Sequence, residues 1–351
     1  MNITKIAFLF LCYCSFGCNQ SVESSKSSPL MDSVHSENSV QSKKSDKPAA
    51  PLTVFRSADG GQTWQDISKG LPNAVKDKYG AGRNVSFADD NGIYLTYGNG
   101  LYHSKTNATD PFWTKENFPD SQPRYFGENA SITPGKTGIF AYNSDGHFLQ
   151  KINGTSKWSP IYTNFHQKRV RSVFESAAGS IFIACDYGLF KSTNSGKTWK
   201  RVYTGGGVYK VVESTGILMA ISAIGIIRST DDGENWDFVI NQERRGFGVE
   251  SIKGGFAVIF YPTATETRKV RTSYDGGKIW QSIDEGLPVN EGITSIIHVG
   301  ENFFCSNSKG ILRSSDKGKT WKLILPSIGK KIFNLSVSGN VIYAIPRNPG
   351  C

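Results

Sequence analysis

The chain has 351 residues, of which 40 are Lys or Arg and 30 are Asp or Glu, so its formal net charge is +10. This moderately basic balance favours anionic partners, and it is also compatible with a merely soluble surface. Three of the six cysteines, Cys185, Cys305 and Cys351, lie beyond the N-terminal region. An odd number without short spacings excludes a disulfide framework and a cysteine metal site.

Residues 1–17 are predicted to be an export signal. They carry one charge, Lys5, and an apolar run, "IAFLFLCYCSF", of signal-peptide length and too short to span a bilayer. The run ends in "SFGC", which resembles the lipobox of bacterial lipoproteins, although Ser15 stands where that family usually has Leu. The resemblance implies that Cys18 is lipidated and becomes the new N-terminus. The alternative is an ordinary cleaved signal in which Cys18 is incidental.

Residues 18–50 are predicted to be the lipidated cysteine and a disordered polar tether. Ser, Lys, Asn and Pro dominate this stretch, and so few large apolar groups cannot offset the entropy of ordering the chain. Asn19 after the cysteine favours the outer membrane over the inner one, and no acidic run signals display on the outer surface. We therefore expect an outer-membrane lipoprotein of the bacterial cell envelope that faces the periplasm. Without Lys5 and the tether's four charges of each sign, residues 51–351 hold 35 basic and 26 acidic residues, a net charge of +9.

The rest of the chain is an internal repeat. All seven tryptophans end a copy of one phrase, at spacings of 49, 45, 41, 37, 44 and 41 residues. Five copies are close to Ser-x-Asp-x-Gly-x-Thr-Trp and two, "HSKTNATDPFW" and "KINGTSKW", are degenerate. The close copies are "SADGGQTW" (57–64), "STNSGKTW" (192–199), "STDDGENW" (229–236), "SYDGGKIW" (273–280) and "SSDKGKTW" (314–321).

The phrase resembles the Asp-box, or BNR repeat, which implies a β-propeller and leaves the reaction open. Its physical basis is a tight turn, in which Asp or Asn bonds the turn backbone, Gly takes a positive φ, and Trp packs between adjacent sheets. Because the aspartates recur once per repeat, we assign them a structural and not a catalytic role. The residues with this structural role are Asp59, Trp64, Asn194, Trp199, Asp231, Trp236, Asp275, Trp280, Asp316 and Trp321.

Each repeat reads as four short strands. In residues 170–202, "VRSVFE", "SIFIAC" and "GLFKS" alternate apolar positions between turn residues, and a fourth strand follows Trp199. Residues 331–345 supply two inner strands without a box, and residues 52–68 supply a box and two outer strands. The sequence therefore predicts an all-β fold over 51–351, a seven-bladed β-propeller whose N- and C-terminal strands share one blade. Cys185 and Cys305 are predicted to be buried core thiols.

A binding site is expected on the face opposite the boxes. In propellers with this box, that face carries the second-to-third strand loops and the blade-to-blade loops. We assign to it the loops 68–84, 117–131, 163–171, 204–207, 241–248, 261–269, 284–292, 326–331 and 345–350. Arginine forks there could hold carboxylates, sulfates or phosphates, and aromatic rings could stack on sugars or side chains. The bland alternative is that a basic chain must place arginines somewhere, and acidic residues share these loops.

The candidate binding residues follow from these loops. They are Arg83, Arg124, Tyr125, His166, Lys168, Arg169, Arg171, Arg244, Arg245, Arg268, Lys269 and Arg347. The same loops also hold Lys330, Lys331 and the interleaved aromatics Tyr79, Phe126, Phe165, Phe247 and Tyr261.

Enzymatic chemistry is the alternative. A sialidase needs three arginines for the substrate carboxylate, a Tyr with a Glu as the nucleophile pair and an acid Asp, usually with an "RIP" phrase early in the domain. This chain has no "RIP", only "FRS" at the first box. His147 and His166 lie in or beside loops and could serve a lyase, whereas His298 falls in an inner-strand pattern and His103 in a box repeat. The spacings predict no metal site and no cofactor, and an exported lipoprotein is not expected to bind nucleic acid.

Residues 51–351 look most like the single propellers of the photosystem II assembly-factor and sortilin-like group. That resemblance implies a binding module. We therefore expect a monomeric, membrane-anchored, non-catalytic propeller that binds a protein segment or an anionic glycan, with an assembly or scaffold role. The alternative is a polysaccharide lyase or glycosidase with a sialidase-like fold.

Overall fold

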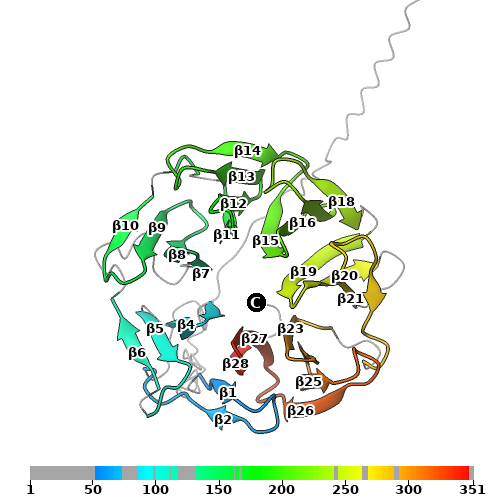
Figure 1. Ribbon diagram of the computed structural model, residues 1–351. Helices are drawn as coiled ribbons and strands as arrows, with labels where there is room; N and C mark the ends of the chain where they lie inside the picture. The colour runs from blue at the N-terminus through cyan, green and yellow to red at the C-terminus, as the bar shows by residue number, and fades with distance from the viewer. Residues whose placement is uncertain are drawn as a thin grey trace, which may run out of the picture. The chain divides into compact units, whose positions relative to one another are not determined.

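The protein is described from a computed structural model, which covers residues 52–72, 85–97, 100–110, 112–117, 131–161, 163–165, 168–240, 244–262, 268–287 and 292–347. The structure is a seven-bladed β-propeller, as the sequence predicts, with seven four-stranded antiparallel sheets in a ring (Figure 1). In the described ranges no segment is helical, and accordingly no helix there is long and apolar enough to cross a membrane.

Blades 1 to 6 follow the chain, and each runs from an inner to an outer strand. Blade 1 consists of β3 (Ser86–Asp89), β4 (Gly92–Tyr97), β5 (Gly100–Lys105) and β6 (Thr114–Glu116); blade 2 of β7 (Ser131–Gly135), β8 (Gly138–Tyr142), β9 (Phe148–Ile152) and β10 (Trp158–Pro160). Blade 3 consists of β11 (Val170–Glu175), β12 (Ile181–Cys185), β13 (Gly188–Ser192) and β14 (Lys200–Tyr203). Blade 4 consists of β15 (Val208–Ser214), β16 (Ile217–Ser222), β17 (Gly225–Ser229) and β18 (Asp237–Ile240). Blade 5 consists of β19 (Arg244–Ile252), β20 (Gly255–Pro262), β21 (Lys269–Ser273) and β22 (Gln281–Ser282); blade 6 of β23 (Ser295–Val299), β24 (Asn302–Asn307), β25 (Gly310–Ser314) and β26 (Lys322–Pro326).

Blade 7 closes the ring with both ends of the propeller, which confirms the predicted shared blade. Its inner strands are β27 (Ile332–Ser338) and β28 (Val341–Arg347), and its outer strands are β1 (Phe55–Ser57) and β2 (Gln65–Asp66). β1 pairs antiparallel with β28, with Phe55 opposite Ala344. This pairing removes the sheet edges that an open ring would expose.

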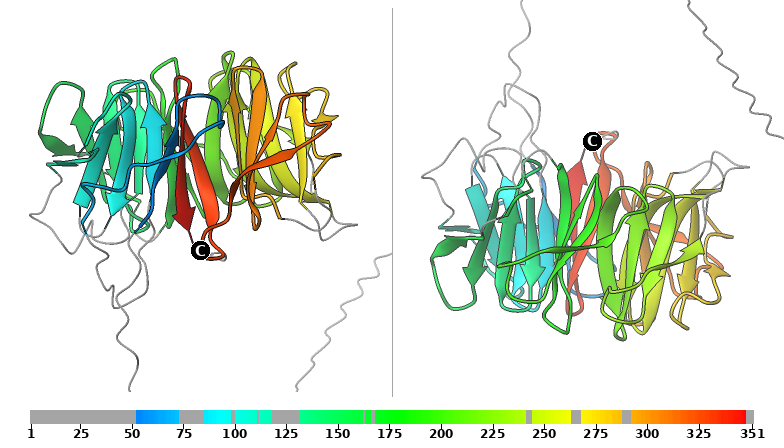
Figure 2. Two further views of the ribbon diagram at one scale, coloured as in Figure 1. Left: turned by 90° about the horizontal axis from the view of Figure 1, so that it is seen from below. Right: turned by 90° about the horizontal axis from the view of Figure 1, so that it is seen from above.

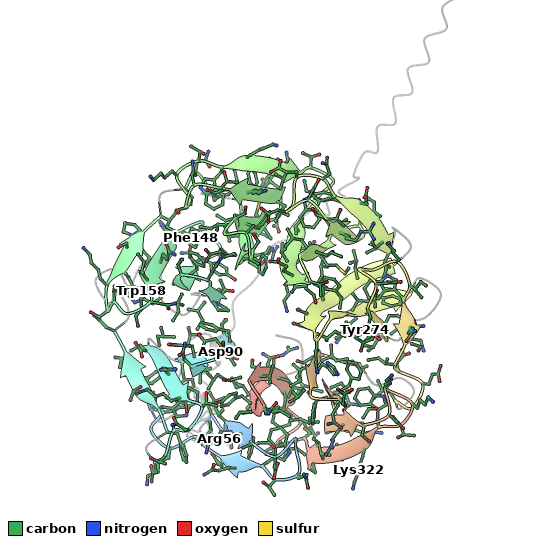
Figure 3. All side chains as sticks on the ribbon, in the orientation of Figure 1. Arg56, Asp90, Phe148, Trp158, Tyr274 and Lys322 are labelled. Atoms are coloured by element: carbon green, nitrogen blue, oxygen red, sulfur yellow. The ribbon has the colours of Figure 1, made fainter. Side chains whose placement is uncertain are left out.

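Apolar side chains between neighbouring sheets form the core, and each interface has its own buried cluster (Figure 3). One tryptophan joins each cluster, from the blade that follows the interface in the ring. Some indoles also reach back to the preceding blade: the Nε1 of Trp113 donates to the Ile67 carbonyl at 2.7 Å, and that of Trp321 donates to the Ile283 carbonyl at 3.0 Å. The predicted role of the tryptophans as wedges between sheets is thus what the structure shows.

The repeated phrase forms the turn between the third and fourth strands, as expected. In blade 7, Ser57 Oγ donates to Asp59 Oδ1 at 2.8 Å and accepts from Gly61 N at 2.8 Å. The Asp59 carboxylate also accepts from Thr63 Oγ1 at 2.6 Å and from Thr63 N at 2.9 Å. These hydrogen bonds, the Thr63 hydroxyl first, lower the pKa of Asp59 to about 2. The carboxylate therefore holds the turn in its ionised form.

The turn needs more positive φ angles than the sequence predicts. The glycine of the box has a positive φ, such as 81° at Gly196 and 85° at Gly318, and the residue directly before it also has a positive φ. That residue is Gly at position 60 but Ser195, with a φ of 58°, and Lys317, with a φ of 59°, in other copies. Side chains resist this left-handed conformation, so these two copies store strain in the turn.

On the third strands of blades 3, 4 and 7, a basic residue contacts the box of the next blade. Arg56 Nη1 donates to the Ala108 carbonyl in the box of blade 1, and Arg228 Nη1 donates to the Gly276 carbonyl in the box of blade 5. Lys191, only 6% exposed, bonds Glu234 at 2.8 Å and lies 3.1 Å from Asp232 in the box of blade 4. The boxes thus take part in the contacts between blades.

Two faces of the ring follow from this topology (Figure 2). The box face carries the boxes and the first-to-second strand turns, and the connection face carries the second-to-third strand turns and the blade-to-blade connections. Cys185 and Cys305, on second strands, are fully buried thiols, as predicted.

Candidate binding site

The described part of the connection face is basic. Its acidic side chains are Asp145, Asp186, Asp284 and Glu285. Its basic side chains are Lys168, Arg169, Arg171, Arg268, Lys269, Lys309, Lys330, Lys331 and Arg347. The box face mixes both signs, because each aspartate of a box sits near lysines such as Lys278 and Lys319. A surplus of positive charge on one face would attract anionic partners to it.

The inner strands of three adjacent blades each contain a β-bulge at their connection-face end. The pairing of β11 with β12 shifts between Val170 and Ser172, that of β15 with β16 between Val208 and Lys210, and that of β19 with β20 between Gly246 and Gly248. Within the described residues, the inner strand pairs of the other four blades show no such shift. Bulges re-aim side chains and are over-represented beside functional sites.

The bulged residues of blades 3 and 4 are Arg171 and Tyr209, and their side chains meet. The Arg171 guanidinium lies 5.8 Å from the centre of the Tyr209 ring, and Asp186 on the β12–β13 turn holds it in place. Arg171 Nε and Nη2 donate to the two carboxylate oxygens of Asp186 at 2.6 and 3.0 Å. The hydrogen bonds to Asp186 raise the pKa of Arg171 above its usual value.

Two exposed tyrosines belong to the same region: Tyr209 contacts Arg171, and Tyr187 follows Asp186 in the chain. Tyr187, next to Asp186 on the turn, is 56% exposed, and Tyr209 is 41% exposed. The Arg201 side chain donates to the Tyr187 carbonyl and fixes the turn from the outer strand. We call Lys168, Arg169, Arg171, Asp186, Tyr187 and Tyr209 the mouth cluster, because all six lie where the inner part of blades 3 and 4 meets the connection face.

Lys168 and Arg169 complete the mouth cluster. The Lys168 ammonium lies 5.1 Å from the centre of the Phe165 ring and 4.9 Å from that of Phe190, which holds its stem against the core. Arg169 is exposed, has a φ of 49°, and finds no ion-pair partner among the residues that the structure describes. Arg169 is therefore the mouth-cluster cation most open to a ligand.

Several predicted loop residues belong to strands instead. Arg171 lies in β11, Lys269 begins β21 and Arg347 ends β28. Arg244 and Arg245 lie in β19, opposite Pro262 and Tyr261, so the predicted loop 241–248 is wrong from 244 onward. The inner pair of blade 5 is longer than the alternation pattern suggests, since its bulge at 247 lets pairing continue past a Gly-rich stretch. The side chains of Arg244 and Arg245 lie outside the described residues.

Three predicted basic residues are used within the fold. Arg268 Nη1 donates to the Ile293 carbonyl at 2.5 Å, which ties blade 5 to blade 6. Lys269 Nζ lies 4.0 Å from the buried Asp284 carboxylate, and Arg347 Nε donates to Asn334 Oδ1 at 2.8 Å. The remaining candidates, Arg83, Arg124, Tyr125 and His166, lie outside the described residues, as do Tyr79, Phe126 and the lipidation candidate Cys18.

The aromatic part of the prediction needs one correction and two additions. Phe165 is not presented to a ligand but is fully buried in the cluster between blades 2 and 3, against Trp199. Tyr187 and Tyr209 were not among the predicted site residues. The short turn "DYG" between two apolar strands could have pointed to Tyr187. Nothing in the local pattern signals the bulge that exposes Tyr209.

The described histidines do not gather at the mouth cluster. His103 in β5 is buried and stacks on Tyr94 at 4.1 Å, and His298 in β23 stacks on Phe303 at 4.5 Å. Burial lowers the pKa of both histidines. His147 lies in the β8–β9 turn, where its backbone N–H donates to Asn143 Oδ1 at 3.0 Å. Among the described residues no three His, Cys, Asp or Glu side chains are arranged to hold a metal ion.

No known protein family matches the sequence, and no curated protein matches it either. Solved structures do share the fold. YCF48 bound to D1 peptide is 13% identical, covers 76% of this chain and 94% of its own, and has a TM-score of 0.56. The GH74 enzyme of Niastella koreensis is 12% identical, covers 75% of this chain and 51% of its own, with a TM-score of 0.58. Virginiamycin B lyase of Staphylococcus aureus is 12% identical, covers 76% of this chain and 95% of its own, with a TM-score of 0.54. At these identities the likeness shows the propeller fold alone.

Proposed function

We propose that this chain is a non-catalytic binding module that captures an extended segment of a partner protein at the mouth cluster. The observation that carries the proposal is the row of bulges in β11, β15 and β19, which present Arg171 and Tyr209 on a face with surplus positive charge. Exposed tyrosines supply large, rigid contact areas at low entropic cost. The peptide-bound YCF48 structure supports the idea that a propeller of this size can bind a segment.

A protein segment fits the mouth cluster better than an anionic glycan. A glycan recognised by its sulfates or carboxylates needs free arginine forks, but both carboxylate oxygens of Asp186 already occupy Arg171. Lys168 packs over two rings, which leaves Arg169 as the open cation. Exposed Tyr187 and Tyr209 then dominate the contact area.

The membrane anchor belongs to the same proposal. The "SFGC" ending before Cys18 and the polar stretch to residue 50 support a lipidated cysteine and a tether that hold a monomeric propeller at the outer membrane, facing the periplasm. The repeated box supports a place among the Asp-box propellers, whose turn hydrogen bonds it reproduces. A tethered binding module would act in assembly or as a scaffold.

The enzyme alternative receives less support from the mouth cluster. A glycosidase needs a carboxylic acid that can donate a proton beside a second carboxylate. Asp186 is the single carboxylate of the mouth cluster, and both of its oxygens accept hydrogen bonds from Arg171. Because the fold is similar to that of a GH74 enzyme and of a lyase, the test of the proposal includes an assay for carbohydrate binding and cleavage.

Cross-linking in intact cells tests the proposal directly. The full chain would be compared with the variant Arg169→Ser/Tyr187→Ser/Tyr209→Ser and with a control on the box face, Tyr274→Ser, whose ring is 51% exposed. We expect a discrete set of proteins to cross-link to the full chain and to the control, and to be lost from the triple variant. Equal cross-linking by all three proteins would refute the mouth cluster as the site. Binding of a glycan array, or release of sugar products, in place of protein capture would support the alternative.

A further inference from the structure

The connection between blades 3 and 4 lacks side chains at three successive positions, Gly205 to Gly207. A side chain would be crowded at Gly205 and Gly207 and would strain the backbone at Gly206. A Cβ on Gly205 would lie 2.5 Å from the Tyr203 hydroxyl, and one on Gly207 would lie 3.1 Å from the Asp186 carbonyl oxygen. Gly206 has a φ of 117°, which side chains rarely adopt. The three glycines therefore form a low, fixed floor between the two blades.

Two aromatic rings stand beside this floor. Tyr187 follows Asp186, on whose backbone Gly207 packs, and Tyr209 comes two residues after Gly207. Both rings are well exposed, at 56% and 41%. We call Tyr187, Gly205–Gly207, Tyr209 and the Arg171–Asp186 pair the glycine sector. Bare backbone flanked by tyrosine rings offers flat contact area to a ligand of little charge.

The charges of the glycine sector cancel locally, unlike those of the rest of the connection face. Arg171 donates two hydrogen bonds to Asp186, and its guanidinium carbon lies 5.8 Å from the centre of the Tyr209 ring. An acidic ligand here would have to displace Asp186 and would meet its negative charge. The Asp186 side chain is 30% exposed, so a ligand on the glycine sector would come within its field. The sector thus selects against acidic groups on an otherwise basic face.

We propose that the glycine sector takes an uncharged, proline-containing stretch of the partner segment, and that Asp186 is the specificity-determining residue that excludes acidic stretches. This inference rests on the proposed function of segment binding and names the chemistry of the segment. A proline-rich stretch is extended before binding and loses little entropy on docking to an aromatic-lined surface. Asp186 acts through Arg171, whose position over Tyr209 it sets.

Selection from a phage-displayed library of random dodecapeptides tests this inference. All seven core clusters lie within residues 52–345, so the propeller, residues 48–351, folds as a unit and can be immobilised alone. The proteins compared are the wild type, Tyr187→Ser/Tyr209→Ser, Asp186→Asn, and the box-face control Tyr274→Ser. Thermal melts of all four check that each variant is folded.

We expect the wild type and the control to enrich the same uncharged, proline-containing peptides. A synthetic copy of an enriched peptide should bind the double tyrosine variant about 10-fold less tightly or weaker still, because both exposed aromatic contacts are lost. Asp186→Asn frees the Arg171 fork while keeping the shape of the side chain. We expect this variant to enrich peptides with Asp or Glu instead, and to bind them less well as salt increases.

Each other outcome counts against one idea or both. Acidic peptides enriched on the wild type, or an unchanged preference in Asp186→Asn, would overturn this inference and leave segment binding intact. If proline-containing peptides bound Tyr187→Ser/Tyr209→Ser as tightly as the wild type, this inference would also be overturned, because the peptides would then bind elsewhere. No enriched peptide on any of the four proteins, or oligosaccharide binding in their place, would contradict segment binding itself.

Discussion

Two single substitutions at the same strained position of the box turn, in different blades, are expected to change the free energy of unfolding in opposite directions. Lys317 has a φ of 59°, a conformation that costs a side chain about 1–2 kcal/mol, while glycine in the unfolded chain costs about 0.5–1 kcal/mol of extra entropy. The equivalent Gly60 has no atom near an added Cβ, so the position needs no side chain for packing. Lys317→Gly should therefore raise the free energy of unfolding by about 0.5–1 kcal/mol.

Asp232 occupies the same position in blade 4, with a φ of 53°, yet its removal should destabilise. Its carboxylate accepts from Ser180 Oγ at 2.6 Å and lies 3.1 Å from the ammonium of Lys191, which is only 6% exposed. Hydrogen bonds to charged groups are worth about 1.5–3 kcal/mol each, more than the relief of strain. We expect Asp232→Gly to lower the free energy of unfolding by about 1–3 kcal/mol.

Equilibrium urea titrations of the two variants and the wild type measure both changes. Ser195→Gly is the matched control, because Ser195 occupies the same turn position with a φ of 58° and has no ion pair that the substitution would remove. For about 300 residues, 1 kcal/mol corresponds to a shift of about 1–2 °C in melting temperature, so titration is the sharper assay. If Asp232→Gly stabilised the protein as Lys317→Gly does, the argument that Lys191 depends on the box would be wrong.

Three further predictions concern the boxes and the core. The pKa values of Asp59, Asp231 and Asp316 are lowered to about 2, so the stability that these carboxylates contribute is complete above about pH 4 and is lost as the pH falls towards 2. Asp316→Asn places at this position the residue found at Asn194, and the free energy of unfolding of this variant should depend less on pH between 4 and 2. In urea titrations, Trp113→Phe should lower the free energy of unfolding by about 1–3 kcal/mol more than Trp64→Phe. Trp113→Phe leaves the Ile67 carbonyl without its hydrogen-bond donor, whereas the buried Nε1 of Trp64 has no described partner to lose. Equal losses of stability in the two variants would contradict this reasoning. Burial raises the pKa of the Cys185 and Cys305 thiols, so a thiol reagent should label neither in the native state and both in urea, and fast native labelling would show that the second strands open.

The fold was predictable because the same sequence pattern recurs once in each blade. The seven tryptophans mark seven interfaces, and the strand pattern around residues 170–202 matches β11 to β14 closely. The shared blade was predictable too, since residues 331–345 lack a box and residues 52–68 lack inner strands. Each of these signals is local and repeated, so one copy corrects another.

The candidate site was predictable only in part, because its features are not repeated in every blade. The sequence placed Lys168, Arg169 and Arg171 on the connection face, where the structure has them, but it could not show that Asp186 occupies the Arg171 fork. The bulge at Tyr209 adds one residue to a strand without breaking its apolar pattern, so alternation alone gives no sign of it. Phe165 reads as a loop aromatic, yet three-dimensional packing buries it.

Among the described turns, the one in the mouth cluster differs in sequence from its equivalents in other blades, and this difference argues for a function. A residue that a blade needs for stability recurs around the ring, as the tryptophans and the Ser and Asp of the box do. The turn that carries Asp186 and Tyr187 in blade 3 carries Ala223 and Ile224 in blade 4, and Ser308 and Lys309 in blade 6, and those blades fold equally well. Blade stability therefore does not require an exposed tyrosine there. A costly exposure of apolar surface that stability does not require is what a contact with a partner would explain.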